Sequence, residues 1–376
     1  MPRQFKGQSP ALTFISKLGA CYFSRFCHQF LQGLLMRTYS SMQNLNISTH
    51  SCSRFTEPGK PLMNILFKSL FEQNNKVSSY FYIKYPDRVR RKLSRMIHHG
   101  HENLQIISDF DWTLSRAVTK EGELNATCHG IFERDPEITN EARTKLRMLK
   151  QTYGSVEFDK NIPNSFKIPY MLEWWDISHR VIVSCDIHKS TLRSTVYNSN
   201  LQLRDRVPEF MAELHKHKIP VVVFSAGLGN VIELVLEKEG LLYNNVKVAS
   251  NFMNFNEEGL LVSFQSSVIH TFNKAFGSLA LSEEDRKLFA KKRCVMLLGD
   301  SLYDQHMADG LVEDNSHEDV SDEESSVVLK IGFLNGKIET LLEEYMELYD
   351  IVLTCNDGFD LPLEILNCIV ESSQTE

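Results

Sequence analysis

The stretch "IISDFDWTLS", residues 106–115, decides the fold of this chain, because an apolar run ends there in two carboxylates one residue apart. Side chains alternate between the two faces of a strand, so Asp109 and Asp111 point the same way if the strand runs through them. Two like charges held that close repel each other unless one takes up a proton or a cation lies between them. The stretch therefore predicts a strand that ends in a reactive or metal-binding group.

Further apolar runs of strand length follow, separated by segments with the spacing of amphipathic helices. They lie at residues 219–227, 245–250, 294–300, 327–333 and 350–355. One intervening helix is expected over residues 205–218, where Val207, Phe210, Met211 and Leu214 recur at helical spacing. Strands that alternate with helices predict an α/β fold with a doubly wound parallel sheet.

A long helical stretch interrupts this alternation. Residues 114–204 carry mostly helical patterning, including the segment 138–154, and they separate the first of these strands from the second. An insertion of that size indicates a separate lid. We therefore expect an α-helical cap at residues 114–204 and a core formed by residues 57–113 and 205–376.

Residues 1–56 differ in composition from the rest, since they hold six Lys or Arg and no acidic residue. Three interpretations stay open for this extension: mitochondrial targeting by residues 1–55, targeting to the endoplasmic reticulum, and a disordered extension that depends on the start site. Lys17, Arg25 and His28 interrupt its apolar-rich part, so no run of about 18 apolar residues is available to span a membrane. No membrane span is expected.

Charge and cysteine content exclude several classes of protein. The 376 residues carry a formal charge of -7, and the part after the basic extension is clearly acidic, which argues against a nucleic acid polymer as partner. The eight cysteines include no CxxC pair, so neither a zinc finger nor a disulfide scaffold is expected. Reduced thiols indicate a cytoplasmic protein, and we expect a monomer.

Three of the predicted strands end in reactive side chains. The first ends in Asp109 and Asp111. Another ends in Ser225 and a third in Asp300, with Lys274 between them in the sequence. Ligands of open α/β sheets bind beyond the carboxyl ends of the strands. A single acid after an apolar run is commonly a helix cap, but three such ends together with a lysine favour one active site.

Phosphoryl transfer accounts for the acidic residues, because its transition state needs positioning and cations more than covalent chemistry. Mg²⁺ prefers oxygen ligands and bridges to phosphate, so Asp109 and Asp300 indicate a magnesium site. Asp109 is placed to attack phosphorus and to form an aspartyl-phosphate. Asp111 is placed to protonate the leaving alcohol and then to deprotonate the attacking water.

The remaining polar groups suit the phosphate. Ser225 and the backbone N–H groups that follow it, beginning with Ala226, precede a helix start and can donate to phosphate oxygens. Lys274 supplies a fixed positive charge for the same group. Asp304 could hold either a metal-bound water or the lysine, and both alternatives stay open.

These motifs, in this order, resemble those of the haloacid dehalogenase superfamily of phosphohydrolases. The segment "DFDWT" matches its DxDxT nucleophile motif, which ends in Thr113, and "GDSLYD" matches its acidic motif. "FSAG" and Lys274 match its serine and lysine motifs. Segments such as "TCHGIF", "YMLEWW" and "IHTFNK" are also similar to the cytosolic pyrimidine 5'-nucleotidase family, or cytosolic 5'-nucleotidase type III, and the likeness covers roughly residues 65–370.

The resemblance implies a Rossmann-like core with an inserted helical cap. It also implies Mg²⁺-dependent hydrolysis of nucleoside 5'-monophosphates, with cytidine and uridine monophosphates favoured. Asp111 would reach the metal through its backbone carbonyl, and Glu157 and Ser178 would contact the base and sugar side of the nucleotide. The implied residues are Asp109, Asp111 and Asp300 at the metal; Ser225, Ala226, Lys274, Glu157 and Ser178 at the substrate; and Thr113 and Asp304 in support.

Two alternatives stay open. One is a phosphatase of the same superfamily that acts on another phosphate, such as 7-methylguanosine monophosphate, and the other is an inactive nucleotide-binding module. The intact acidic, serine and lysine motifs speak against the second. The chain departs from the family at Tyr303, where glycine is usual, and in the acidic stretch 312–326, which is longer than usual.

Overall fold

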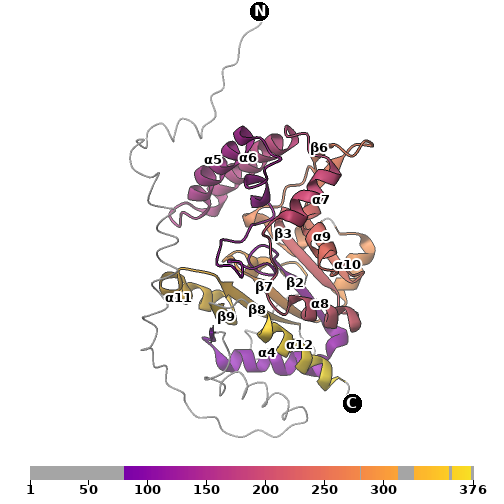
Figure 1. Ribbon diagram of the computed structural model, residues 1–376. Coiled ribbons are helices and arrows are strands. Elements are labelled where there is room, and N and C mark those ends of the chain that lie inside the picture. Colours follow the sequence, from indigo (N-terminus) through magenta and orange to yellow (C-terminus); the bar gives the residue numbers. More distant parts are fainter. Residues whose placement is uncertain (1–79, 280, 312–325, 355–357, 374–376) are drawn as a thin grey trace, which may run out of the picture. The chain divides into compact units, whose positions relative to one another are not determined.

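A seven-stranded sheet lies at the centre of the computed structural model, which describes residues 80–279, 281–311, 326–354 and 358–373 (Figure 1). Six of the strands run parallel, and β1 pairs with β9 in the antiparallel direction at one edge. The predicted doubly wound, mostly parallel α/β fold is confirmed. In order across the sheet, the strands are β1 (Tyr80–Tyr82), β9 (Ile351–Thr354), β8 (Val327–Leu334), β7 (Cys294–Gly299), β2 (Leu104–Ser108), β3 (Val221–Leu228) and β4 (Val246–Asn251).

The chain reverses its direction across the sheet beside β2. From β2 it moves to β3 and β4 on one side, and it then crosses back to β7, β8 and β9 on the other. Ser108 pairs with both Val223 and Leu298, which brings the carboxyl ends of β2, β3 and β7 to one edge. Such a switch point leaves a crevice in which α/β proteins bind ligands.

The two faces of the sheet bury alternate residues of the same strands, as strand geometry requires. Ile106 belongs to one hydrophobic cluster and Ile107 to the other. The apolar stripe predicted between Val207 and Leu214 is buried in the first cluster. That cluster is covered by α4 (Pro86–His99), α8 (Val207–Lys216), α9 (Gly229–Lys238) and α12 (Asp360–Ser372), and the second by α10 (Glu283–Ala290) and α11 (Ile338–Leu348).

The segment between β2 and α8 is helical, and it contains α5 (Asn140–Glu157), α6 (Asn164–Val183) and α7 (Lys189–Asn198). Helix α5 begins where the Thr139 side chain accepts a hydrogen bond from the Ala142 N–H, as an N-cap residue does. Figure 1 shows α5 and α6 side by side beyond the edge of the sheet at which the β2 and β3 strands end.

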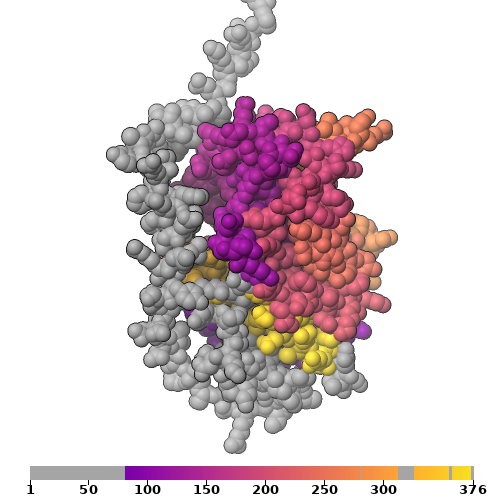
Figure 2. Space-filling model, viewed as in Figure 1, coloured from indigo at the N-terminus to yellow at the C-terminus, as the bar shows by residue number. Residues whose placement is uncertain are grey.

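A hairpin from the later part of the chain packs against these helices. It consists of β5 (Met253–Phe255) and β6 (Leu261–Phe264). The Leu261 N–H donates to the Ile187 carbonyl over 2.9 Å, and the Phe264 ring stacks on His179 with ring centroids 3.8 Å apart. In Figure 2 the helices, in purple and magenta, and the tip of the hairpin, in orange, lie at the same end of the molecule.

Two sequence predictions fall outside the described residues, namely the extension 1–56 and the acidic stretch 312–326 except for its last residue. In the part of the chain that is described, no helix is both long and apolar enough to cross a membrane. The cysteines of that part, Cys128, Cys185, Cys294 and Cys368, are free thiols.

Candidate active site

Asp109 directly follows β2 and is held through both its backbone and its side chain. Its N–H donates to the Leu298 carbonyl over 2.9 Å, which extends the pairing of β2 with β7 by one residue. Its Oδ1 accepts a hydrogen bond of 2.6 Å from Lys274 Nζ, and 6% of the residue is exposed. Burial raises the pKa of Asp109 to about 7, against the opposing effect of Lys274 and with a further contribution from Asp304. The carboxylate is therefore fixed in place at the strand end.

A tight turn, rather than a continued strand, positions Asp111. β2 ends before Asp109, and Trp112 has a φ of 61°, in the left-handed region. The side-chain alternation expected for the two aspartates therefore does not apply. Asp111 Oδ1 accepts a hydrogen bond of 2.8 Å from the Cys128 N–H. Burial raises the pKa of Asp111 to about 6, and the Cys128 N–H opposes this rise. A pKa near neutrality suits a group that gives and takes a proton.

Arg204, which sequence reasoning missed, holds this turn from the far end of the helical segment. Its Nε donates to the Thr113 carbonyl over 2.8 Å and its Nη2 to the Trp112 carbonyl over 2.6 Å. Thr113 is fully buried, and its hydroxyl has no hydrogen-bond partner among the described residues. No local pattern marks Arg204, because Thr113 lies 91 residues earlier in the chain.

Lys274 connects Asp109 to Asp304. Its Nζ lies 2.6 Å from Oδ1 of each carboxylate. Burial lowers the pKa of this ammonium, but the two carboxylates outweigh burial and raise it above its ordinary value. The other Asp304 oxygen accepts hydrogen bonds from the Asp300 and Ser301 N–H groups, over 3.1 and 2.9 Å. Of the two alternatives for Asp304, the structure shows the one in which it binds the lysine.

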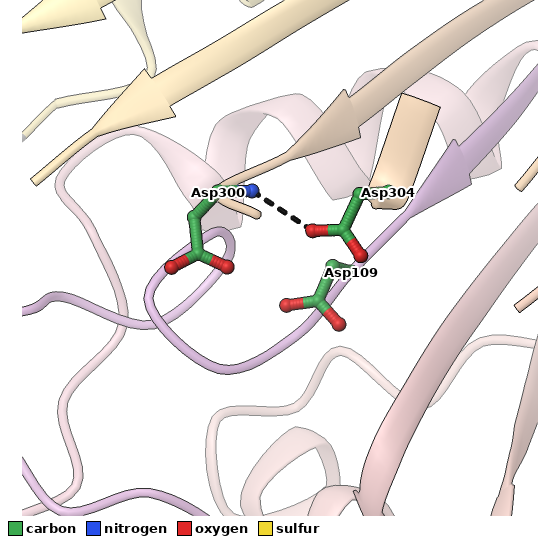
Figure 3. Close-up of side chains that lie close together, drawn as sticks. All are labelled: Asp109, Asp300 and Asp304. Atoms are coloured by element: carbon green, nitrogen blue, oxygen red, sulfur yellow. Dashed lines mark hydrogen bonds between the residues drawn. The ribbon is translucent and has the colours of Figure 1, made fainter. Parts of the chain in front are cut away.

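Asp109, Asp300 and Asp304 point into one space (Figure 3), and each offers a carboxylate oxygen within 4.8 Å of the others. Burial, with Asp109 and Asp304 adding to it, raises the pKa of Asp300 well above its ordinary range. An all-oxygen donor set of acidic side chains suits a hard divalent cation. The family resemblance places Asp111 at the metal through its backbone carbonyl, and the carboxyl group of Asp111 is bonded to the Cys128 N–H.

Ser225 and Ala226 lie near the end of β3, where the pairing with β4 becomes irregular. Ser225 is buried, and its Oγ accepts a hydrogen bond of 2.9 Å from the Gly227 N–H, so the hydroxyl keeps its hydrogen to donate. The Asn251 amide, also missed from sequence, donates to the Ala226 carbonyl over 2.8 Å. A Cβ at Gly227 would lie 3.1 Å from Asp111 Oδ2 and from Ser225 Oγ, so this bend directly adjoins the carboxylates.

The two residues predicted in the helical segment differ in their surroundings. Glu157 ends α5, and its Oε1 accepts a hydrogen bond of 2.5 Å from the Thr271 hydroxyl, three residues before Lys274. Burial raises the pKa of Glu157, and the Thr271 hydroxyl opposes the rise. Ser178 lies in α6 with 1% of its surface exposed, and its hydroxyl has no hydrogen-bond partner among the described residues. Glu157 therefore faces the loop that carries Lys274, and Ser178 has a hydroxyl without a partner among the described residues.

Two tyrosines at the carboxyl end of α11 bind the loop that begins with Asp300 and Ser301. Sequence reasoning also missed this contact. The Tyr345 hydroxyl donates to the Asp300 carbonyl over 2.5 Å, and the Tyr349 hydroxyl donates to the Ser301 carbonyl. Both tyrosines are buried. Their spacing in the sequence is that of ordinary core residues, so only the folded chain reveals this contact.

Comparisons with known proteins identify the family of this chain. The sequence model of the Pyrimidine 5'-nucleotidase (UMPH-1) family matches residues 112–370. The chain is 38% identical to the Xenopus laevis "7-methylguanosine phosphate-specific 5'-nucleotidase A" over 284 residues, which are 76% of this chain and 93% of that protein. It is 34% identical to the Homo sapiens "7-methylguanosine phosphate-specific 5'-nucleotidase" over 288 residues, 77% of this chain and 92% of the human one.

Two further relatives have cytosolic nucleotidase names. The "Putative cytosolic 5'-nucleotidase 3" of Caenorhabditis elegans is 34% identical over 294 residues, 76% of this chain and 74% of that protein. The crystal structure of cytosolic 5'-nucleotidase IIIB bound to cytidine is similar with a TM-score of 0.71 and 31% identity, over 82% of this chain and 99% of that one. The chain therefore belongs to the pyrimidine 5'-nucleotidase (UMPH-1) family, and it is a 5'-nucleotidase, a hydrolase that acts on a nucleotide.

Proposed function

We propose that this enzyme hydrolyses nucleoside 5'-monophosphates with the help of Mg²⁺ and by way of an aspartyl-phosphate at Asp109. The observation that carries the proposal is the group formed at the switch point of the sheet by the buried Asp109, Asp304 and Lys274 and the partly buried Asp300. Such a group concentrates negative ligands around one cation site beside a fixed ammonium, which is what phosphoryl transfer requires. A helix cap or a structural ion pair would not need four of these residues.

Asp109 acts as the nucleophile in this proposal. Its carboxylate oxygen forms a bond to phosphorus, and the ester bond between phosphorus and the nucleoside 5'-oxygen breaks. Asp111 gives its proton to the departing 5'-oxygen and so releases the nucleoside. Asp111 then takes a proton from a water that attacks phosphorus, and inorganic phosphate leaves while the Asp109 carboxylate is restored.

The oxygen donors present fit Mg²⁺. Asp109 and Asp300 would hold the ion with their carboxylates, and Asp111 with its backbone carbonyl. The bound ion supplies positive charge that offsets the negative charge on the phosphate oxygens. Asp304 stays with Lys274 and with two backbone N–H groups, so it fixes the lysine and the loop.

Three groups would bind the phosphate oxygens that do not react. Lys274 provides the charge, the Ser225 hydroxyl provides a hydrogen bond, and the Ala226 N–H provides another at the irregular end of β3. The Asn251 and Ser250 side chains hold the carbonyls of this bend, at Ala226 and at the next residue, which keeps the donors directed toward the carboxylates.

We further propose that residues 114–204 form a cap whose Glu157 reads the base. A carboxylate accepts hydrogen bonds from the exocyclic amine of cytosine or from the N–H groups of 7-methylguanine, whereas it repels the carbonyl edge of uracil. Cytidine monophosphate and 7-methylguanosine monophosphate are therefore the favoured substrates, and uridine monophosphate is a weaker one. The names of the vertebrate relatives and the cytidine bound to the similar structure support this choice.

A cytoplasmic location is part of the proposal. The free thiols of the described residues suit a reducing compartment, and the C. elegans relative carries a cytosolic name.

Phosphate release from a panel of nucleotides tests the proposed function. Cytidine, 7-methylguanosine, uridine and adenosine monophosphates are each supplied to the purified protein with Mg²⁺ or with EDTA. We expect release from the first two, less from the third, and loss of all activity in EDTA. Equal rates with and without the chelator would contradict the magnesium assignment, and a preference for uridine monophosphate would contradict the role of Glu157.

A further inference from the structure

Two side chains beside the phosphate site reach across to the turn between α5 and α6. The Thr271 hydroxyl donates to Glu157 Oε1 over 2.5 Å. The Tyr303 hydroxyl donates to Asn164 Oδ1 over 3.1 Å. The Phe272 ring lies against the Tyr303 ring edge to face, with centroids 4.8 Å apart and an angle of 83° between the planes. The core thus contacts both ends of the turn, the end of α5 and the beginning of α6.

Lys167 fastens the same turn from the side of the helices. It is 2% exposed, and its Nζ donates to the Glu157 carbonyl over 2.8 Å. The same Nζ lies 5.4 Å from the centroid of the Phe272 ring, within the range of a cation–π contact. A buried ammonium needs such partners because its desolvation is costly. Lys167 therefore ties the end of α5 to α6 and presents its charge to a ring of the core.

We infer that these contacts form a clasp that holds the cap closed over the phosphate site, and that Tyr303 positions the cap on the bound nucleotide. The clasp consists of Thr271, Phe272 and Tyr303 of the core with Glu157, Asn164 and Lys167 of the cap. The inference rests on the proposed function in one respect, since it takes residues 114–204 as a cap that closes on substrate.

The core residues of the clasp lie close in the sequence to residues of the proposed active site. Thr271 precedes Lys274 by three residues, and Tyr303 directly precedes Asp304. Lys274 and Asp304 are bonded to each other, so both core loops of the clasp end in one buried ion pair.

Hydrogen exchange in the metal-free, substrate-free protein tests the clasp without any turnover. The reporter is the turn at residues 158–163, in which the Phe158 and Asp159 N–H groups donate to carbonyls of α5 and the Ile162 N–H donates to the Asp159 carbonyl. Tyr303→Phe and Asn164→Ala each remove one partner of the same bond, so each should speed exchange in the turn by about two- to tenfold. The double variant should exchange no faster than either single one. Tyr243→Phe, before β4 at the opposite edge of the sheet, serves as the control and should change nothing.

Steady-state kinetics then distinguishes a role of Tyr303 in positioning the cap from a general disturbance of the active site. Tyr303→Phe should raise the KM of every nucleotide by the same factor, about two- to tenfold, and leave kcat undiminished. Tyr303→Gly, which also removes the ring, should have a larger effect in the same direction. Hydrolysis of p-nitrophenyl phosphate, which has no nucleoside for the cap to enclose, should stay within about twofold of the wild-type rate.

Three results would overturn the clasp. Exchange in the turn unaffected by Tyr303→Phe would mean that the contact does not hold the cap, and additive effects of the two single variants would mean that the two residues act separately. If Tyr303→Phe slowed the hydrolysis of p-nitrophenyl phosphate as much as that of nucleotides, Tyr303 would act by holding the loop of Asp304 and not by holding the cap. If instead the wild-type enzyme releases no phosphate from nucleotides, the proposed function fails, and the exchange experiment still decides the clasp.

Discussion

The carboxyl edge of the sheet and the helical cap face the same proposed substrate, but the fold positions their side chains in different ways. Asp109 continues a strand ladder, and its N–H is bonded to the neighbouring strand. Glu157 ends a helix, and a single side-chain hydrogen bond from Thr271 connects its carboxylate to the core. Backbone pairing between strands thus positions the side chains at the sheet edge. In the cap, side chains are positioned by contacts with other side chains, and a single substitution can remove such a contact.

The charges differ as well. At the sheet edge, Asp109 and Asp304 share the Lys274 ammonium, and buried charges of this kind are costly unless each is paired. In the cap, Glu157 accepts a hydrogen bond from one hydroxyl, and the Ser178 hydroxyl has no partner in the described part of the chain. We expect changes at the sheet edge to alter the rate by orders of magnitude, and changes in the cap to alter the choice of nucleotide by smaller factors.

Loss of the nucleophile should give the largest effect. Asp109→Asn cannot form the aspartyl-phosphate, so kcat should fall at least about a thousandfold with the fold retained. Asp309→Asn, an exposed carboxylate five residues after Asp304, is the matched control and should keep the wild-type rate. Phosphate release measures the rate and circular dichroism the fold. Retention of more than about a tenth of the rate would remove Asp109 from the role of nucleophile.

Loss of a metal ligand should cost less and should be partly reversible. Asp300→Asn weakens the oxygen site, so magnesium affinity should fall at least roughly tenfold, and added Mg²⁺ should restore part of the activity. A magnesium titration of kcat for the wild type and the variant measures both. If high magnesium restores nothing, Asp300 is not a ligand.

Much of the sheet edge could be predicted from sequence, because residues at the ends of apolar runs are brought together by strand pairing alone. Asp109, Ser225 and Asp300 are of this kind. The partners that hold them could not be predicted, since Arg204 and Tyr345 reach the site through contacts between distant segments. The antiparallel edge strand β1 escaped prediction for a related reason, because three residues carry too little pattern.

The cap could be predicted as an insertion but not in its contacts. Helical spacing indicates α5, but it does not show that Glu157 meets Thr271, which lies 114 residues further along the chain. The departure at Tyr303 was visible in the sequence. Its bond to Asn164 was not, because nothing in either segment specifies which residue of the cap lies opposite.

The carboxyl group of Asp111 should make the metal-free protein less stable at neutral pH. Its pKa is raised from 3.8 to about 6 in the folded state, so the folded protein binds more protons between these two pH values. The contribution of Asp111 to the unfolding free energy should therefore fall as pH rises from about 4 to about 6 and stay level above that. Asp111→Asn removes this contribution and should raise stability at pH 7 by on the order of 3 kcal/mol. Urea unfolding in EDTA at pH 4 and 7 measures the difference, and an unchanged pH dependence in the variant would contradict the assignment.

Removal of the cap carboxylate should affect selectivity more than rate. Glu157→Ala should raise the KM of cytidine monophosphate about tenfold and that of uridine monophosphate less, with little change in kcat. Thr271→Val breaks the same hydrogen bond but keeps the carboxylate, so it should change both KM values equally. Steady-state kinetics on the two nucleotides tests this. Equal losses from Glu157→Ala would mean that Glu157 does not read the base.

Removal of residues 1–55 should have the smallest effect on catalysis. No motif of the site lies there, so kcat and KM should stay within about twofold of the full-length values. Fluorescent fusions of both forms report localisation, and we expect the same cytoplasmic distribution for each. A shift of the full-length form to mitochondria or to the endoplasmic reticulum would show that the extension is a targeting segment.

Direct capture of the covalent intermediate tests the central claim, that Asp109 at the end of β2 takes up the phosphoryl group. Cytidine monophosphate labelled at phosphorus is mixed with the enzyme and Mg²⁺, quenched in acid within milliseconds, and the protein is digested for mass spectrometry. The label is expected on the peptide that contains Asp109, and it should be absent from the Asp109→Asn variant. Release of labelled phosphate with no label on any peptide, or label on another residue, would contradict the account.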